Sequence, residues 1–350
     1  MTFSVRLRTL IAGSAGLATL AGCADPAAPL PAPSEVVLVV NSIESSLSVI
    51  PVDATSQTYE IALGGTTPTP VGVSARLGWA VVPMGVDHSA TVVDLANGAV
   101  ARVVPLANGS FATGSAIVDD SIAYVANPGL NTVTRINYLT GDTASVAVGV
   151  YPQGVIATRG KVFVLNGNLV NYAPAGPGWI TVVDPVTNAR ATGIDSIPLP
   201  LPGNPQFAAL GGDGRIYVMN VGNYVDDGRL SIVDPVSRME LANFGGFGPG
   251  PGNLATDGGP RLFISSFTEG VMEFDIESRE VVRGAGDGVP VPDNSAVAVD
   301  SKGAVYAISA GCGGGGGGEA HILRPDLTER TTVPLGVCAI GTAVTSIPAE

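Results

Sequence analysis

A short apolar run that ends in Asn, Ser or Pro recurs seven times along the chain, and a second apolar run follows each copy. The last residues of successive first runs are 39 to 54 positions apart. The first runs occupy 38–41, 80–83, 124–127, 163–166, 217–220, 263–266 and 306–309. The second runs occupy 47–51, 90–94, 133–137, 180–184, 230–234, 271–275 and 320–324.

Each repeat contains two further short runs, one often ending in Gly and one starting near Pro or Gly. The runs are rich in Val, Ile, Thr and Tyr, which favour strands, and turn-forming residues separate them. Because the runs are apolar without clean alternation, we expect strands that are buried on both faces. Four strands in a period of about 40–45 residues indicate a β-propeller blade. The sequence therefore predicts an all-β fold with seven four-stranded antiparallel blades over residues 36–350.

The two ends of the array predict how the ring closes. The first repeat begins at its second strand, whereas residues 338–346 look like a first strand with no second strand after it. We expect this C-terminal strand to join blade 1 as its innermost strand, which removes an open sheet edge.

The N-terminus has the features of an export signal. Arg6 and Arg8 precede an apolar run over 10–20, which is too short to span a bilayer. The run ends in Leu20-Ala21-Gly22-Cys23, which resembles a bacterial lipobox. We expect residues 1–22 to be a signal peptide, Cys23 to be lipidated, and 23–35 to form a Pro/Ala tether; the alternative is an ordinary secretory signal with an incidental Cys.

This interpretation makes the protein a cell-envelope lipoprotein, on the periplasmic side or at the cell surface, held to a lipid membrane by acylated Cys23.

The composition argues against one class of function and one class of fold. The formal net charge of −13 argues against nucleic-acid binding. The 47 Gly and 27 Pro argue against a helical bundle. We expect a monomer.

The repeats resemble the YVTN family of seven-bladed propellers. The resemblance lies in Tyr124 to Asn127, Phe163 to Asn166 and Tyr217 to Asn220, together with Ile180 to Pro185 and Leu230 to Pro235. Blades 1, 2, 6 and 7 depart from the Y-V-x-N pattern and are identified by spacing. The resemblance implies an exported propeller with interaction or binding roles; related propellers include lactonases and cofactor-bearing dehydrogenase subunits.

Two cysteines remain besides Cys23. Cys312 follows the second strand of blade 7, and Cys338 begins the closing strand of blade 1, so both are expected on one face and in adjacent blades. In an exported protein this arrangement predicts a disulfide, with two free thiols as the alternative. The glycine run 313–318 lacks the following Lys and helix of a phosphate-binding loop, and we interpret it as a surface loop.

Few residues suit catalysis. The two histidines are His88, in a loop of blade 2, and His321, in an outer-strand position of blade 7. No zinc, haem or GxSxG motif is present in the sequence, so no resident cofactor is expected.

The long loops of blades 4 and 5 are the best candidates for ligand binding, since insertions in repeats often map to a binding face. Their candidate residues are Asn166, Asn171, Tyr172, Trp179, Asn220, Asn223 and Tyr224. The Asn residues at strand ends have two interpretations: each bonds its own turn, or together they form a polar ring at the channel mouth. Asp226 and Asp227 suggest a Ca²⁺ site, with a solvated acidic turn as the alternative.

These observations favour a non-catalytic scaffold that binds an unknown protein, glycan or small ligand on the loop face of blades 4–6. One alternative is a lactonase-like or other sugar-acid hydrolase, with or without the help of a metal ion. Such an enzyme needs its polar groups to converge on the central channel of the propeller. Its candidates are Asp226, Asp227, Asn166, Asn220 and Arg135. Another alternative is a structural cell-surface component. Fold analogy alone does not choose among them.

Overall fold

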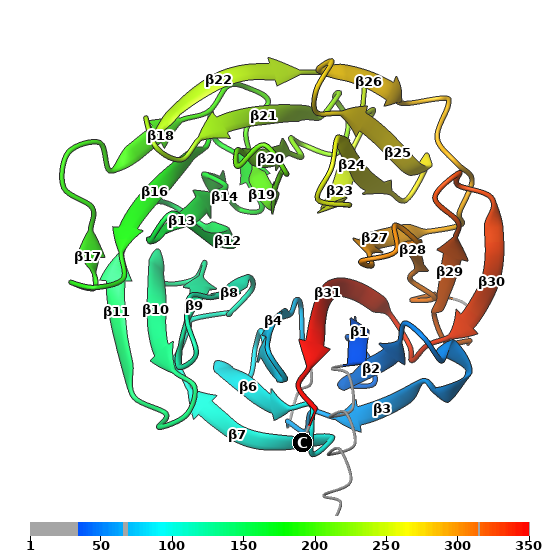
Figure 1. Ribbon diagram of the computed structural model, residues 1–350. Helices are drawn as coiled ribbons and strands as arrows, with labels where there is room; N and C mark the ends of the chain where they lie inside the picture. The colour runs from blue at the N-terminus through cyan, green and yellow to red at the C-terminus, as the bar shows by residue number, and fades with distance from the viewer. Residues whose placement is uncertain (1–33, 66–68, 314–315, 350) are drawn as a thin grey trace, which may run out of the picture.

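The computed structural model describes residues 34–65, 69–313 and 316–349. The predicted signal peptide, Cys23 and nearly all of the predicted tether lie outside these residues. Seven antiparallel sheets form a ring around a central axis (Figure 1), which confirms the predicted seven-bladed propeller. In the described part of the chain no helix is long and apolar enough to cross a bilayer.

The blades are numbered along the chain, with their strands given from the axis outward. Blades 1 to 3 are built from β31 (Ala339–Ile347), β1 (Ser34–Asn41), β2 (Ser46–Pro51) and β3 (Tyr59–Ala62); β4 (Ser74–Arg76), β5 (Trp79–Pro83), β6 (Ser89–Asp94) and β7 (Ala99–Pro105); and β8 (Ser115–Ile117), β9 (Ile122–Asn127), β10 (Thr132–Asn137) and β11 (Thr143–Ala147). The short 3-10 helix η1 (Thr55–Gln57) connects β2 to β3.

Blades 4 and 5 carry the long insertions. Their strands are β12 (Pro152–Thr158), β13 (Lys161–Asn166), β16 (Trp179–Asp184), β17 (Ala189–Arg190) and β18 (Ser196–Pro198); and β19 (Pro205–Leu210), β20 (Ile216–Asn220), β21 (Arg229–Asp234) and β22 (Met239–Phe244). The outer strand of blade 4 is interrupted, because β17 and β18 pair with opposite ends of β16. The region expected as a loop between β13 and β16 contains a small hairpin of β14 (Leu169–Val170) and β15 (Ala173–Pro174).

Blades 6 and 7 return to the regular pattern. They comprise β23 (Pro251–Thr256), β24 (Arg261–Ser266), β25 (Gly270–Asp275) and β26 (Glu280–Arg283); and β27 (Asn294–Val299), β28 (Val305–Ser309), β29 (Glu319–Leu323) and β30 (Glu329–Pro334).

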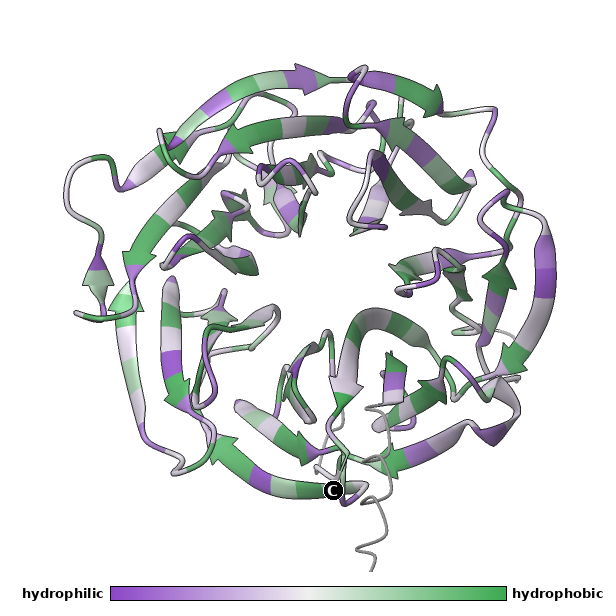
Figure 2. Cartoon of the chain, viewed as in Figure 1, coloured by the Kyte–Doolittle hydropathy of each residue, from purple (hydrophilic) through white to green (hydrophobic). Residues whose placement is uncertain are grey.

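The core of the molecule lies between blades rather than within one blade. One cluster of buried apolar side chains fills each of the seven interfaces between neighbouring blades. Figure 2 shows apolar segments in the strands of every blade, and most of the fully buried apolar residues belong to the second and third strands, because each of their two faces packs on a different neighbour. This explains why the sequence shows continuous apolar runs instead of alternation.

Blade 1 closes the ring as predicted. Its inner strand β31 comes from the C-terminus and pairs with β1, with Ser34 opposite Ile347 and Asn41 opposite Ala339. Both described chain ends therefore lie on one face, which we call the terminal face. The opposite face, where Asn41 and Ala339 lie, is called the loop face. It carries the connections from second to third strands and from each blade to the next.

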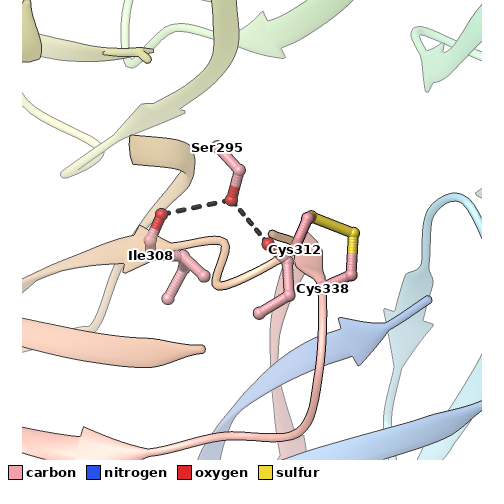
Figure 3. The surroundings of a disulfide bond; sticks show 5 residues. Ser295, Ile308, Cys312 and Cys338 are labelled. Carbon is pink, nitrogen blue, oxygen red and sulfur yellow. Dashed lines mark hydrogen bonds between the residues drawn. A yellow bond between two sulfur atoms is a disulfide. The ribbon is translucent and has the colours of Figure 1, made fainter. Parts of the chain in front are cut away.

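A disulfide joins blades 7 and 1 on the loop face. Cys312, which follows β28, is bonded to Cys338, which precedes β31, with a sequence separation of 26. Beside it, Ser295 of β27 donates its hydroxyl to the carbonyl oxygens of Ile308 and Ala339, at 3.1 and 2.7 Å (Figure 3). The bond thus covalently ties the segment that leads into the closing strand β31 to blade 7, and it confirms the disulfide predicted from the sequence.

The inner strands approach one another closely where glycine occurs. A Cβ built on Gly114 would clash with the backbone carbonyl oxygen of Gln153 in the next blade. The Thr113 hydroxyl bonds that same carbonyl oxygen at 3.0 Å. Only a residue without a side chain fits between these two backbones.

Gly114→Ala is therefore expected to lower the free energy of unfolding by about 1–3 kcal/mol, since the clash involves backbone that has little room to move. The measurement is the urea unfolding midpoint. Gly313→Ala serves as control because a Cβ there meets nothing within 4 Å. Equal midpoints for the two variants would contradict the proposed close packing.

Candidate functional site

The loop face combines exposed apolar side chains with negative charge. Its loops contain seven acidic residues and, in sequence, no Lys or Arg. The acidic residues are Glu44, Asp87, Asp226, Asp227, Glu269, Asp287 and Asp293. Exposed large apolar residues on the same loops are Ile43, Val86, Phe111, Leu130, Val170, Tyr172, Leu201, Tyr224, Val225 and Phe267. Several of them belong to blades 4 to 6, where the sequence predicted a binding surface.

Three tyrosines lie together on the loops of blades 4 and 5. The rings of Tyr151 and Tyr172 meet edge to face, with centroids 6.1 Å apart. Burial is the main cause that raises the pKa of Tyr151, and the nearby Tyr172 and Tyr224 hydroxyls add to it. Tyr172 is 80 % exposed and Tyr224 is 57 % exposed. The two predicted tyrosines are thus available to a partner.

Asn171 and Tyr172 form the two-residue turn of the β14–β15 hairpin. Val170 pairs with Ala173, and both turn residues have positive φ, at 51° and 64°. This is the geometry of a tight hairpin turn, which Asn tolerates well and Tyr does not. The hairpin therefore holds an exposed aromatic ring in a conformation that most side chains avoid.

Asn223 shapes the corresponding loop of blade 5. Its Oδ1 accepts the backbone N–H groups of Val225 and Asp226, both at 2.9 Å, and its Nδ2 donates to Asp226 Oδ2 at 2.8 Å. The side chain thereby stabilises a turn that presents Tyr224.

Asp227 is engaged by the next loop of the ring. Its carboxylate accepts three backbone N–H groups, from Gly246 at 2.7 Å, Phe247 at 3.0 Å and Gly248 at 2.7 Å. Among the described residues no group of three or more His, Cys, Asp or Glu side chains is arranged to hold a metal ion. Ca²⁺ binding at Asp226 and Asp227 stays a prediction, and the geometry gives it no support.

Asn166 and Asn220 are fully buried, so a ligand does not reach them in this structure. Asn166 Nδ2 donates to Thr181 Oγ1 at 3.0 Å, and Asn220 Nδ2 donates to Ser231 Oγ at 2.8 Å. Trp179, at the start of β16, is partly buried and pairs with Asn166 across the sheet, where its backbone carbonyl accepts the Asn166 Nδ2 at 3.0 Å.

Asn41 and Asn127 make the same kind of contact with Ser48 and Thr134. These asparagines thus link second to third strands inside the blades. Each amide also bonds the residue at the far end of its own connection, which agrees with the interpretation that these asparagines stabilise their turns; the partners are Ser46, Thr132, Trp179 and Arg229. None of the four asparagines belongs to the described lining of the axial cavity.

A cavity of about 430 Å³ occupies the axis and is lined by all seven blades. Its walls are backbone, apolar, amide and hydroxyl groups, with no charged side chain among the described lining residues. The lining consists of Val71, Gly72, Val73, Thr113, Gly114, Ser115, Gln153, Gly154, Val155, Gln206, Phe207, Ala208, Asn253, Phe267, Ser295, Ile340, Gly341 and Thr342.

The amide side chains of the cavity sit at breaks in strand pairing. The register shifts between Pro152 and Val155, between Pro205 and Phe207, and between Pro251 and Leu254. Gln153, Gln206 and Asn253 occupy these three breaks. A bulge changes the direction of a side chain, and all three of these residues, from adjacent blades, border the cavity.

Sequence reasoning missed these amides. The sequence pattern predicts short runs that start near Pro or Gly at 152, 205 and 251, and each of these runs places an amide one or two residues after a Pro. That spacing was the available signal.

The residues proposed for hydrolysis do not converge on the cavity. Asp226, Asp227, Asn166, Asn220 and Arg135 are all absent from its described lining. Arg135 lies in the middle of β10, the third strand of blade 3, paired opposite Tyr124 and Ala144.

The histidines also lie apart from the cavity. His88 packs edge to face on Phe111, with ring centroids 5.1 Å apart, and its Nδ1 accepts the Phe111 N–H at 3.4 Å. His321 lies in β29, the third strand of blade 7, where its Nδ1 is 2.9 Å from Glu329 Oε2 and its Nε2 is 3.7 Å from Glu319 Oε2.

Comparisons with known proteins identify the fold. No family model matches the chain, and no curated protein matches it in sequence. Among solved structures it resembles a chain described as Kuenenia stuttgartiensis hydrazine synthase, with a TM-score of 0.61 and 15 % sequence identity. The match covers 80 % of this chain and 96 % of that chain. At this level of identity the likeness shows the propeller fold alone.

Proposed function

We propose that the protein is a membrane-anchored, extracytoplasmic binding scaffold of the YVTN repeat type, which offers the loop face of blades 4–6 to a partner without catalysing a reaction. The observation that carries this proposal is the set of exposed aromatic and aliphatic side chains on the loop face, one of which, Phe267, also lines a cavity that has no charged group in its described lining. Tyr is enriched in binding hot spots because it offers a rigid apolar ring with a polar tip.

The position of the chain ends supports the anchoring part of the proposal. Ser34, where the folded part begins, lies on the terminal face, while Tyr172 and Tyr224 lie on the loop face. A lipid on Cys23, followed by a short Pro/Ala tether, would hold the terminal face toward the membrane. The loop face would then point away from the lipid and toward a partner.

The negative charge of the loop face limits which partner surfaces can bind to it. The seven carboxylates of the loops, without Lys or Arg among them, repel acidic surfaces and favour neutral or basic ones. A hydrolase that releases a sugar acid would have to release an anion through this negative face without a converging acid or base.

Photo-crosslinking on intact cells tests the proposal. Benzoylphenylalanine is placed at 172 or 224 on the loop face, and at Val186 as a control, because that side chain is 90 % exposed on the terminal face. We expect adducts of defined mass at 172 and 224 at several times the yield at 186. Equal yields at all three positions would contradict a loop-face site. Adducts containing only second copies of this chain would favour a structural cell-surface component instead.

A further inference from the structure

Three amide side chains in the central cavity are held by neighbouring groups so that each keeps unused hydrogen-bonding capacity. Asn253 Oδ1 accepts the backbone N–H of Val297 in the next blade, at 3.1 Å. This contact assigns the oxygen and nitrogen positions of the Asn253 amide. It leaves the two N–H donors on Nδ2 of Asn253 without a partner in the described part of the protein.

The amides of blades 4 and 5 are fixed in a similar way. Gln206 Oε1 accepts the hydroxyl of Tyr224 at 3.3 Å, which leaves the two N–H donors of Gln206 unused among the described residues. Gln153 Nε2 donates to Asn204 Oδ1 at 2.6 Å, and Asn204 Nδ2 donates to Gly222 O at 3.1 Å. The side-chain oxygen Oε1 of Gln153 therefore remains as an acceptor among the described residues.

The hydroxyl groups of the lining are engaged by the protein itself. Each of them donates to a backbone carbonyl oxygen. Ser295 donates to those of Ile308 and Ala339. Thr342 donates to the backbone carbonyl of Val297 at 2.7 Å, and Thr113 donates to the backbone carbonyl of Gln153. The amides are therefore the polar side chains best placed to serve a ligand. They come from three adjacent blades and lie in three equivalent bulges.

We propose that the cavity mouth binds a neutral saccharide unit, with the side-chain N–H groups of Gln206 and Asn253 and the side-chain oxygen Oε1 of Gln153 bonding its hydroxyls. A sugar hydroxyl both donates and accepts, so neighbouring hydroxyls match a set of amide donors and one acceptor. Phe207 and Phe267, also in the lining, supply apolar surface for the C–H groups of the ring. This inference rests on the proposed function, since it names a ligand class for the same face.

Charge and size exclude the main alternatives. The described lining offers neither a carboxylate for a cation nor a basic group for an anion, so burying either ion there would be unfavourable. Acidic sugars are further disfavoured by the seven carboxylates of the loop face. A volume of about 430 Å³ lies within the range of small-molecule sites.

Isothermal titration calorimetry on the purified body, residues 24–350, tests the inference. The probes are glucose, N-acetylglucosamine, mannose and the trisaccharides maltotriose and chitotriose, with glucuronate as the charged counterpart. We expect at least one neutral probe to bind and glucuronate to bind at least tenfold more weakly than glucose or not at all.

Gln206→Leu and Asn253→Leu remove the proposed donors while keeping similar volume. Each is expected to weaken binding of the neutral probe about three- to tenfold, the usual range for one neutral hydrogen bond. Gln57→Leu is the control, because Gln57 is exposed on the terminal face. Far-UV circular dichroism and the melting temperature confirm that each variant is folded.

Three results would overturn the inference: no neutral probe binding at millimolar concentration, tighter binding of glucuronate than of the neutral sugars, or unchanged affinity in both cavity variants. The outcome of the crosslinking experiment does not depend on any of these three results. Loop-face adducts without sugar binding would thus refute the saccharide and leave the scaffold standing, whereas sugar binding with no loop-face adducts would do the reverse.

Discussion

Ending the chain at Ala339 is expected to abolish the cooperative unfolding of the propeller. The truncation removes nearly all of β31 but keeps Cys338, so the disulfide is not the variable. Blade 1 loses its inner strand, and β1, which is fully buried over 36–41, is left with an unpaired edge facing the axis. Ala343, Val344 and Ile347 also leave the apolar clusters that join blade 1 to its two neighbours.

The expected loss is comparable to the whole stability of a domain, about 5–15 kcal/mol. Urea unfolding followed by circular dichroism measures it, with size-exclusion chromatography to detect aggregation. The matched control ends the chain at Ile347, which removes only the residues beyond β31 and should leave the midpoint unchanged. A sharp transition near that of the full-length body in the Ala339 truncation would show that closure by β31 is dispensable.

Replacing both disulfide cysteines, Cys312→Ser and Cys338→Ser, is expected to give the second largest effect. The bond closes a loop with a sequence separation of 26. In the chain-entropy model, which attributes the effect to the unfolded state, such a loop contributes about 3 kcal/mol. At about 2 °C per kcal/mol for a chain of this size, the melting temperature should fall by roughly 6 °C.

Differential scanning calorimetry of the body 24–350, with Cys23 absent, checks this value. Reductant should lower the melting temperature of the unmodified body by a similar amount and leave the double variant unchanged. Thiol titration of the denatured, unreduced body gives an independent answer: two free thiols would refute the bond.

The architecture was predictable from the sequence because the same pattern of apolar runs occurs seven times along the chain. One irregular repeat is ambiguous, but seven apolar runs at similar spacing leave few folds possible, and the mismatch between the first and last repeats indicates the closing strand. Cys312 and Cys338 could be paired for the same reason, since the blade order places 312 and 338 in adjacent blades on one face. These predictions depend on the order of strands, which the spacing of apolar runs reveals.

The site was less predictable because it depends on register. The sequence does not show whether Gln153 continues the pairing of β12 or sits in a bulge, and that difference decides whether its side chain lines the axis. Asn166 illustrates the same difficulty. Its place at a strand end suggested a loop residue, whereas its amide bonds Thr181 across the sheet and is fully buried.

The loops gave a mixed outcome. The Asn-Tyr pairs of the two long loops do occur on one face, and Tyr172 and Tyr224 lie near the common neighbour Tyr151. The paired acids are a different matter, because Asp227 accepts three backbone amides from a loop about twenty residues later. A long-range contact of this kind leaves no trace in local sequence.

The pairing of Ser34 with Ile347 makes the chain almost circular. A short linker between these neighbouring residues would allow new ends to be opened at a terminal-face turn of another blade, a circular permutation that leaves all seven apolar interfaces intact. The point where the N-terminal segment is attached could thereby be moved around the rim, which would reorient the loop face relative to that segment without altering its residues. In such a design, orientation and specificity can be engineered separately.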